Sequence, residues 1–231
     1  MGRSGYGART ASTISCVIRA VLWDFGGVIL TSPFEAFAAY ERKQGLDSGF
    51  LRRLNATNPH DNAWAKLERG EVGLDEFAAL YEREARALDP RPEVASLSGR
   101  SVIELLAGEI RPEMVAALDA CRAAGLRNAC LTNNIASASE GSSERQARIA
   151  AVMARFDQVV ESSKVGVRKP EPKFYEIACE LLDVSPTECV FLDDLGINLK
   201  PARAMGMTTI KVDQPAPALA ELSEVLGIAL G

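Results

Sequence analysis

The chain has 231 residues, of which 47% are hydrophobic and 25% are charged, and its mean hydropathy is +0.00. These values are typical of a soluble globular protein with a sizeable core. The formal net charge of −5, without any stretch rich in Lys and Arg, argues against a nucleic-acid-binding surface. No segment approaches the roughly 20 apolar residues that a membrane span requires.

The first 16 residues mix Gly, Ser, Thr and Arg and lack the apolar core of a secretory signal. The arginines that precede the first acidic residue, Asp24, are a feature of organelle transit peptides, but the glycines among them make a poor amphipathic helix. Residues 1–16 are therefore predicted to be a disordered tail.

Five cysteines are scattered along the chain without a C-x-x-C pair, and the chain has a single histidine, His60. Neither a disulfide framework nor a zinc site is indicated. One histidine also leaves no obvious Ser-His-Asp triad. Buried, reduced thiols in a cytoplasmic protein are the simplest interpretation.

A β-branched and apolar run predicts the first strand at residues 17–23, which ends at Asp24 and two glycines. Helical spacing of apolar residues then dominates residues 33–107. Because this stretch contains no convincing strand, it is predicted to be a separate helical insertion. Trp64 within it is predicted to pack in the core of the insertion rather than to line a pocket.

From Pro112 onward, short apolar strands alternate with amphipathic helices. Strands are predicted at 126–131, 158–161, 189–192 and 208–212, and helices at 112–124, 172–182 and 197–205. A polar stretch from Ile135 to Arg148 predicts a loop that leads into a further helix. The alternation predicts an α/β fold with a doubly wound parallel sheet and helices on both faces.

Polar residues follow the predicted strands in a fixed order: Asp24, Thr132, Lys169 and the pair Asp193-Asp194. In an open parallel sheet such strand ends open onto one crevice, which is where ligands bind. A carboxylate there can act as a nucleophile and form an aspartyl-phosphate. Asp24 and one aspartate of the pair are suited to Mg²⁺, and Lys169 and Thr132 are suited to the phosphoryl oxygens.

Gly26 and Gly27 would let backbone groups approach the phosphate and the metal closely. Each element alone has a simpler interpretation, because an aspartate that ends a strand is usually a cap and a Lys-Pro pair is usually a solvated turn. Their common position at strand ends, in one order, favours a single site for metal-assisted phosphoryl transfer.

In these segments the chain resembles the haloacid dehalogenase superfamily. The resemblance is most specific at residues 164–172 and 190–203 and extends over about residues 17–212. It is closest to the branch that contains the N-terminal phosphatase domain of mammalian soluble epoxide hydrolase and related acyl-CoA dehydrogenase fusion domains. The resemblance implies a Rossmann-like core, formed by residues 17–32 and 108–231, with residues 33–107 as a helical C1 cap over the strand ends.

By this resemblance Asp24 is the nucleophile and a ligand of Mg²⁺, the expected cofactor. Asp194 would be the direct acidic ligand, and Asp193 would ligate through water or orient its neighbour. The family also ligates the metal through the backbone carbonyl at the position of Gly26, which a glycine retains.

The resemblance assigns the phosphoryl group to Thr132, the Asn133 amide and Lys169, with Gly26 and Gly27 alongside, and Asn198 as a supporting residue. The expected partner is a small phosphorylated molecule rather than nucleic acid or a membrane. The protein is expected to be a monomer or a homodimer.

The family's phosphatases usually carry a second aspartate two residues after the nucleophile, where this chain has Gly26. That aspartate protonates the leaving group and later activates water, and such catalysis is typically worth about 10²- to 10⁴-fold. The chain is therefore expected to favour good leaving groups or to recruit an acid from the cap, where His60, Asp61 and Glu68 are candidates.

Two alternatives to a phosphatase remain open. A metal-independent dehalogenase would use the same Asp24 and would also lack the second aspartate, but enzymes of that type replace the acidic pair that this chain keeps as Asp193-Asp194. A phosphate-binding module without turnover is disfavoured because Asp24, Lys169 and Asp194 are all present. The sequence therefore predicts a Mg²⁺-dependent phosphomonoester hydrolase that acts through an aspartyl-phosphate.

Overall fold

A parallel sheet of five strands, in the order β3-β2-β1-β4-β5, forms the centre of the computed structural model. The structure describes residues 17–134 and 143–230. The strands are β1 (Ala20–Trp23), β2 (Arg127–Thr132), β3 (Gln158–Glu161), β4 (Cys189–Asp193) and β5 (Thr208–Lys211). The chain starts in the middle of the sheet and builds outward on both sides, as the predicted doubly wound topology requires.

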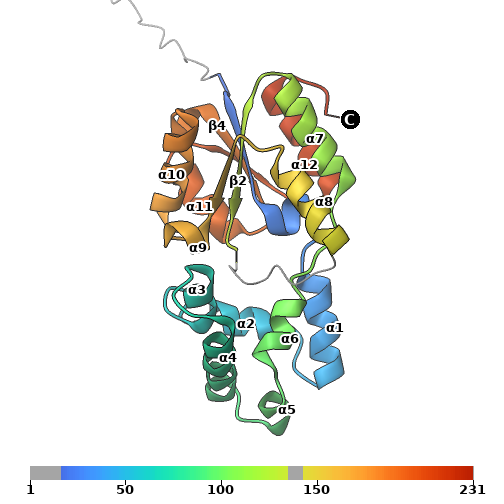
Figure 1. The fold of residues 1–231 in the computed structure, drawn as a ribbon, viewed down its shortest axis with the longest axis vertical. Helices are drawn as coiled ribbons and strands as arrows, with labels where there is room; N and C mark the ends of the chain where they lie inside the picture. Colours follow the sequence, from blue (N-terminus) through green and yellow to red (C-terminus); the bar gives the residue numbers. More distant parts are fainter. Residues whose placement is uncertain (1–16, 135–142, 231) are drawn as a thin grey trace, which may run out of the picture.

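Helices cover both faces of the sheet and bury alternate residues of each strand (Figure 1). One face is covered by α7 (Pro112–Ala123), α8 (Ser143–Met153) and α12 (Pro215–Leu226), and the other by α10 (Pro172–Leu182) and α11 (Gly196–Ala204). Val21 and Trp23 of β1 belong to the first hydrophobic cluster, and Ala20 and Leu22 to the second. We call the sheet with these helices the α/β core.

The structure confirms the predicted fold class and most of its elements. β3 and α10 have the predicted bounds, while β1 begins at Ala20 rather than at residue 17. Of the predicted polar loop and helix, residues 143–153 form α8. The predicted tail, residues 1–16, and residues 135–142 lie outside the described residues.

Six α-helices between β1 and α7 form a second layer with its own hydrophobic cluster. They are α1 (Phe34–Gln44), α2 (Phe50–Ala56), α3 (Ala63–Glu68), α4 (Leu74–Leu88), α5 (Pro92–Ala95) and α6 (Gly99–Glu104), and we call them the helical block. The Trp64 ring packs 6.0 Å from Phe77 and 6.1 Å from Tyr81, measured between ring centroids. Trp64 is thus part of the packing of the helical block, as the sequence predicted.

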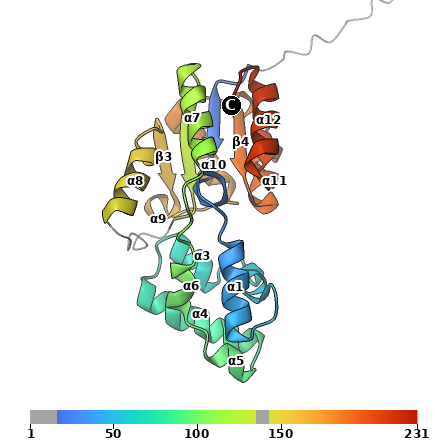
Figure 2. The ribbon, with the colours of Figure 1, turned by 90° about the vertical axis from the view of Figure 1, so that its right-hand side faces the viewer.

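The helical block lies at the end of the sheet where the strands end, as Figures 1 and 2 show from two directions. Two neighbouring linkers, residues 30–33 and 105–111, join it to the α/β core. Leu30 and Ile110 form an antiparallel bridge, and the Thr31 N–H donates to the Glu109 carbonyl at 2.8 Å. The paired linkers hold the helical block over the carboxyl ends of the strands.

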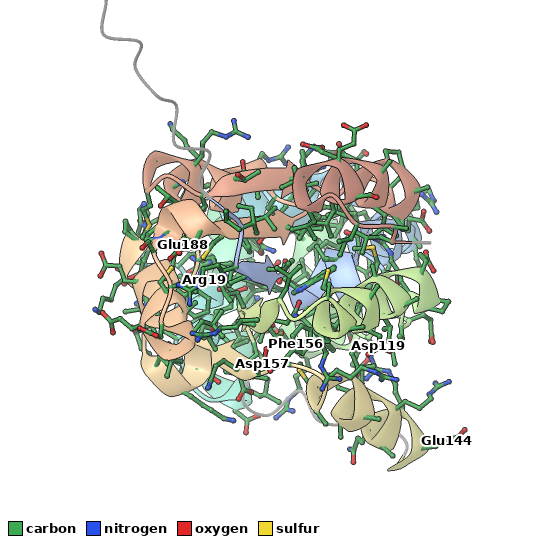
Figure 3. The ribbon with its side chains drawn as sticks, turned by 90° about the horizontal axis from the view of Figure 1, so that it is seen from above. Arg19, Asp119, Glu144, Phe156, Asp157 and Glu188 are labelled. Atoms are coloured by element: carbon green, nitrogen blue, oxygen red, sulfur yellow. The ribbon has the colours of Figure 1, made fainter. Side chains whose placement is uncertain are left out.

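The opposite end of the sheet, seen from above in Figure 3, carries surface ion pairs. Arg19 and Glu188 lie 3.1 Å apart there, beside the short helix η2 (Pro186–Glu188). Within the described residues, no helix combines the length and apolarity that crossing a membrane demands.

Candidate active site

Asp24 leaves the sheet at its centre, between β2 and β4. The register places Trp23 beside Cys130 and Leu192, and the Asp24 N–H donates to the Leu192 carbonyl at 2.9 Å. The chain then turns into η1 (Phe25–Ile29), whose first N–H, that of Phe25, donates to Asp24 Oδ1 at 2.6 Å. The Asp24 carboxylate is thereby fixed at the strand end, as its position in the sequence predicted.

The ammonium group of Lys169 forms an ion pair with the Asp24 carboxylate. Its Nζ lies 2.7 Å from Asp24 Oδ1 and 2.8 Å from Asp193 Oδ2, and the residue is 1% exposed. Burial lowers the pKa of Lys169, but the neighbouring charges of Asp193 and Asp24 outweigh burial and raise it. Lys169 therefore remains a cation in the folded protein.

Asp193, the last residue of β4, and Asp194, which follows it, have different surroundings. Asp193 is fully buried, and its Oδ1 accepts bonds from the Leu195 N–H at 2.8 Å and from Asn198 Nδ2 at 3.0 Å. Asp194 is partly exposed, and its Oδ2 accepts one bond from Ser32 Oγ at 3.3 Å. Asp193 is thus held by protein groups, whereas Asp194 keeps more of its acceptor capacity for a ligand.

Negative charge exceeds positive charge among these groups. Oxygens of Asp24, Asp193 and Asp194 lie within 4.8 Å of one another, with the ammonium of Lys169 beside them. Burial, which outweighs Lys169, raises the pKa of Asp24 well above its usual range, and the charges of Asp193 and Asp194 add to the rise. Burial and the charge of Asp193 raise the pKa of Asp194 to about 6.

A magnesium ion suits this donor set, because clustered carboxylate oxygens with unbalanced charge are the ligands that a hard dication prefers. The backbone nearby is shaped for close approach as well. Gly27 has φ 84°, and a Cβ built on it would lie 2.3 Å from Asp194 Oδ2. Asp24 and Asp194 would hold the ion directly, with Asp193 behind them.

The phosphate-binding candidates lie at the neighbouring strand end. Thr132 is the last residue of β2 and is 8% exposed. Asn133 bonds twice to the Lys169 backbone: its Oδ1 accepts from the Lys169 N–H at 2.9 Å, and its Nδ2 donates to the Lys169 carbonyl at 3.0 Å. The structure thus joins the segment after β2 to the segment that carries Lys169.

The position of the absent second aspartate is open. No heavy atom lies within 4 Å of a Cβ built on Gly26, whose φ of −76° and ψ of 126° suit any residue. Among the candidate acids of the helical block, His60 and Asp61 are exposed, whereas Glu68 is buried and paired with Arg168. Of these three candidate acids, only Glu68 is therefore buried.

Three contacts of the site were not predicted from the sequence. Ser32, in the first linker, bonds to Asp194, and Arg111, in the second, donates from Nη1 to the Gly27 carbonyl at 2.9 Å. Arg168 contacts the helical block, although the sequence motif indicated only its neighbour Lys169.

A buried thiol, Cys130, lies near Asp24, and burial raises the pKa of this thiol. This fits the buried, reduced thiols that the sequence indicated.

Residues 18–206 match the haloacid dehalogenase-like hydrolases, and the chain belongs to this family of enzymes. It is 34% identical over 234 residues to acyl-CoA dehydrogenase family member 10 of Mus musculus, and the aligned region covers 100% of this chain and 21% of the relative. It is 32% identical over 219 residues to bifunctional epoxide hydrolase 2 of Sus scrofa, which covers 92% of this chain and 40% of the relative. These matches confirm the predicted family and branch, and the chain spans less than half the length of either relative.

The fold is also similar to a solved HAD family enzyme from Bacteroides thetaiotaomicron, in complex with magnesium and inorganic phosphate. The TM-score is 0.52 at 18% identity, with 84% of this chain and 93% of the other covered. This likeness concerns the fold. The family match shows a haloacid dehalogenase-like hydrolase, and the reaction of this chain follows only from its own residues.

Proposed function

We propose that this protein is a Mg²⁺-dependent phosphomonoester hydrolase that works through an aspartyl-phosphate at Asp24. The observation that carries the proposal is the cluster of three carboxylates within 4.8 Å, with the Lys169 ammonium beside Asp24 and Asp193. A phosphate monoester brings negative charge of its own, so the site needs a cation as well as Lys169.

In the first step an Asp24 oxygen attacks phosphorus, a new O–P bond forms, and the bond to the ester oxygen breaks. Asp24 Oδ1 is occupied by Phe25 N–H and Lys169, so Oδ2 is the attacking atom. Lys169 neutralises charge on the phosphoryl oxygens, and the Thr132 hydroxyl and the backbone amide of Asn133 orient the group. A bound Mg²⁺ would supply electrophilic stabilisation of that charge.

The leaving group departs with its electron pair. Since Gly26 carries no acid, the leaving oxygen takes its proton from water, which favours leaving groups that are stable as anions. In the second step water attacks phosphorus, the bond to Asp24 breaks, and inorganic phosphate and the free carboxylate result. The helical block over the strand ends would exclude bulk water during transfer and contact the rest of a small organic phosphate.

The absence of an acid at Gly26 favours one further candidate, a dehalogenase that uses Asp24 without a metal. In that reaction the Asp24 oxygen would attack carbon and displace halide, which leaves as an anion without needing a proton. The retained Asp193 and Asp194 favour phosphate over halide, because two additional carboxylates serve a metal better than an anionic leaving group.

Phosphate release from p-nitrophenyl phosphate tests the proposal, with Mg²⁺ and with EDTA, on the wild type and on Asp24→Asn. We expect release that requires Mg²⁺ and is absent from the folded variant. Wild-type release equal to that of the variant would overturn the proposal. Halide release from a 2-haloacid in EDTA, lost in the same variant, would then identify the dehalogenase.

Four described cysteines are buried, and no disulfide joins them within the described part of the chain. Such thiols are compatible with a reducing environment, and we include a cytoplasmic location in the proposal.

A further inference from the structure

Apart from the carboxylate cluster, a buried carboxylate links the helical block to the α/β core. It is the carboxylate of Glu68, whose side chain is 10% exposed. Oε1 accepts from Trp64 Nε1 at 2.8 Å, and Oε2 accepts from Arg168 Nε at 2.5 Å and Asn133 Nδ2 at 3.2 Å. Both oxygens accept hydrogen bonds beside a guanidinium, so Glu68 is a poor proton donor. The carboxylate is instead suited to holding the helical block on the α/β core.

Arg168 holds the helical block at two points. While its Nε bonds to Glu68, its Nη1 donates to the Pro59 carbonyl at 3.0 Å. The guanidinium is a rigid planar donor, so it can make both bonds only when α3 and the segment before it are seated on the core. Arg168 immediately precedes Lys169, so this contact fixes the backbone next to the catalytic ammonium.

Asn133 is the second point of connection. Its amide nitrogen donates to Glu68 Oε2 and to the Lys169 carbonyl, which uses both of its protons. Asn133 immediately follows Thr132. Through the Glu68 carboxylate, the helical block therefore contacts Asn133, the neighbour of Thr132, and Arg168, the neighbour of Lys169.

The backbone around Glu68 is packed closely against the core. Ser162 Oγ, at the start of α9 (Ser162–Val165), donates to the Glu68 carbonyl. A Cβ built on Gly70 would lie 2.9 Å from the Ser163 carbonyl, so the chain approaches here as closely as a glycine allows. The helical block therefore packs closely against the core here, and the Glu68–Arg168 ion pair lies at the edge of this contact.

We propose that Glu68 and Arg168 form a closure latch, which positions Asn133 and the Lys169 backbone for phosphate binding only while the helical block is docked on the core. The inference rests on the proposed phosphatase function, which it deepens. Glu68 and Arg168 are positioning residues in it, since they act through their neighbours rather than on the phosphate.

The energetics of a buried ion pair suit such a latch. Burial raises the pKa of Glu68, and the charge of Arg168 and the bonds from Trp64 and Arg168 oppose that rise. Separating the pair without rehydration leaves a buried charge uncompensated, which is strongly unfavourable. Docked and undocked arrangements are therefore distinct states rather than a continuum, and the phosphate-binding segments are ordered in the docked one.

The test compares the full-length wild type with Glu68→Gln, Arg168→Lys and Arg168→Gln by backbone hydrogen exchange. We expect Glu68→Gln and Arg168→Gln to speed exchange in peptides that cover α3 and α9, with β4 unchanged. Arg168→Lys keeps the charge but replaces two separate donor nitrogens of a rigid plane with a single ammonium, so its exchange should be intermediate. Glu71→Gln is the matched control, because it removes a neighbouring ion pair, with Arg69, in which the Glu71 carboxylate is exposed.

Kinetics then test the coupling to phosphate binding. Misplacement of a catalytic group by about 1 Å can cost about 10²-fold, and we expect kcat for p-nitrophenyl phosphate to fall by about this factor in Glu68→Gln and Arg168→Gln. The double variant should be no worse than either single one, since both disable one unit. Glu71→Gln should retain wild-type kcat.

The outcomes separate the two proposals. Unchanged exchange at α3 and α9 in Glu68→Gln, or an equal change in Glu71→Gln, overturns the latch whatever the activity. Faster exchange with unchanged kcat overturns the coupling to the phosphate-binding segments. A wild type without Mg²⁺-dependent activity overturns the proposed function, and the exchange experiment still decides whether the latch exists.

Discussion

Lys169 Nζ lies 2.7 Å from Asp24 Oδ1, although 145 residues separate them along the chain. The ammonium also contacts Asp193, so one cation serves two buried carboxylates. This arrangement makes Lys169 important for stability as well as for chemistry, because its removal leaves like charges together in a site with little access to water.

We therefore expect Lys169→Met to abolish phosphate release and to lower the free energy of unfolding of the metal-free protein by about 3 kcal/mol. Urea unfolding at neutral pH measures the second effect. In an Asp24→Asn background the same substitution should cost less, because one of the two carboxylates has been neutralised. An equal cost in both backgrounds would show that the ion pair with Asp24 contributes nothing to stability.

The open position at Gly26 gives the second prediction. Gly26→Asp introduces the missing acid where no heavy atom lies within 4 Å of the new Cβ. Turnover of an alkyl phosphate, a poor leaving group, should rise by about 10²-fold, within the usual range for general acid catalysis. Turnover of p-nitrophenyl phosphate should rise much less, because its leaving group needs no proton.

Gly27→Ala is the matched control for this gain. Its Cβ would lie 2.3 Å from Asp194 Oδ2, at a φ of 84° that disfavours alanine. Activity toward both substrates should fall together, since Asp194 is displaced. If Gly26→Asp raised turnover of both substrates equally, the new carboxylate would be acting on the metal or on the fold rather than as an acid.

Local sequence patterns were sufficient for most of the α/β core. Pro172 and the apolar run that begins at Cys189 predicted α10 and β4 closely, because such signals act over a few residues. β1 is shorter than predicted because its register partners, Arg127 and Cys189, are the first residues of β2 and β4. Arg19 bonds through its backbone to both sides but lies before the paired register. α12 was missed, since its first turn contains two prolines, and its place is set by packing on α7.

The same distinction applies to the candidate site: some of its residues could be predicted from local sequence, and some of its contacts could not. Asp24 and the Asp193-Asp194 pair could be found because they follow strands, and parallel strand ends must converge. The pairing of Glu68 with Arg168 could not be found, since 100 residues separate them and the contact depends on how the helical block docks. Local patterns specify each layer, but contacts between layers depend on tertiary geometry that no local pattern encodes.

The third prediction concerns metal binding. Mg²⁺ should raise the thermal midpoint of the wild type, because an ion that binds only the folded state stabilises it by about 2.7 kcal/mol at 100 times its Kd. Asp194→Asn should lose this response. Asp119→Asn, which changes a surface carboxylate on α7 that pairs with Arg155, should keep it. Loss of the response in both variants, or in neither, would contradict a metal site at the strand ends.

The fourth prediction concerns the metal-free protein and acid. Burial and the charge of Asp193 raise the pKa of Asp194 from 3.8 to about 6. Between these values the folded state binds more protons at this group than the unfolded state does. The free energy of unfolding therefore decreases as the pH rises through that interval, and the stabilising contribution is present in full only below it.

Asp194→Asn removes the titrating group while keeping its shape. The difference in unfolding free energy between this variant and the wild type, measured in urea with EDTA, should therefore grow in favour of the variant from about pH 4 to about pH 7. Saturating Mg²⁺ should reverse the difference at the upper end, because the ion stabilises the ionised carboxylates of the wild type. A difference that stays constant across this range would mean that Asp194 ionises in the folded protein as it does in the unfolded chain.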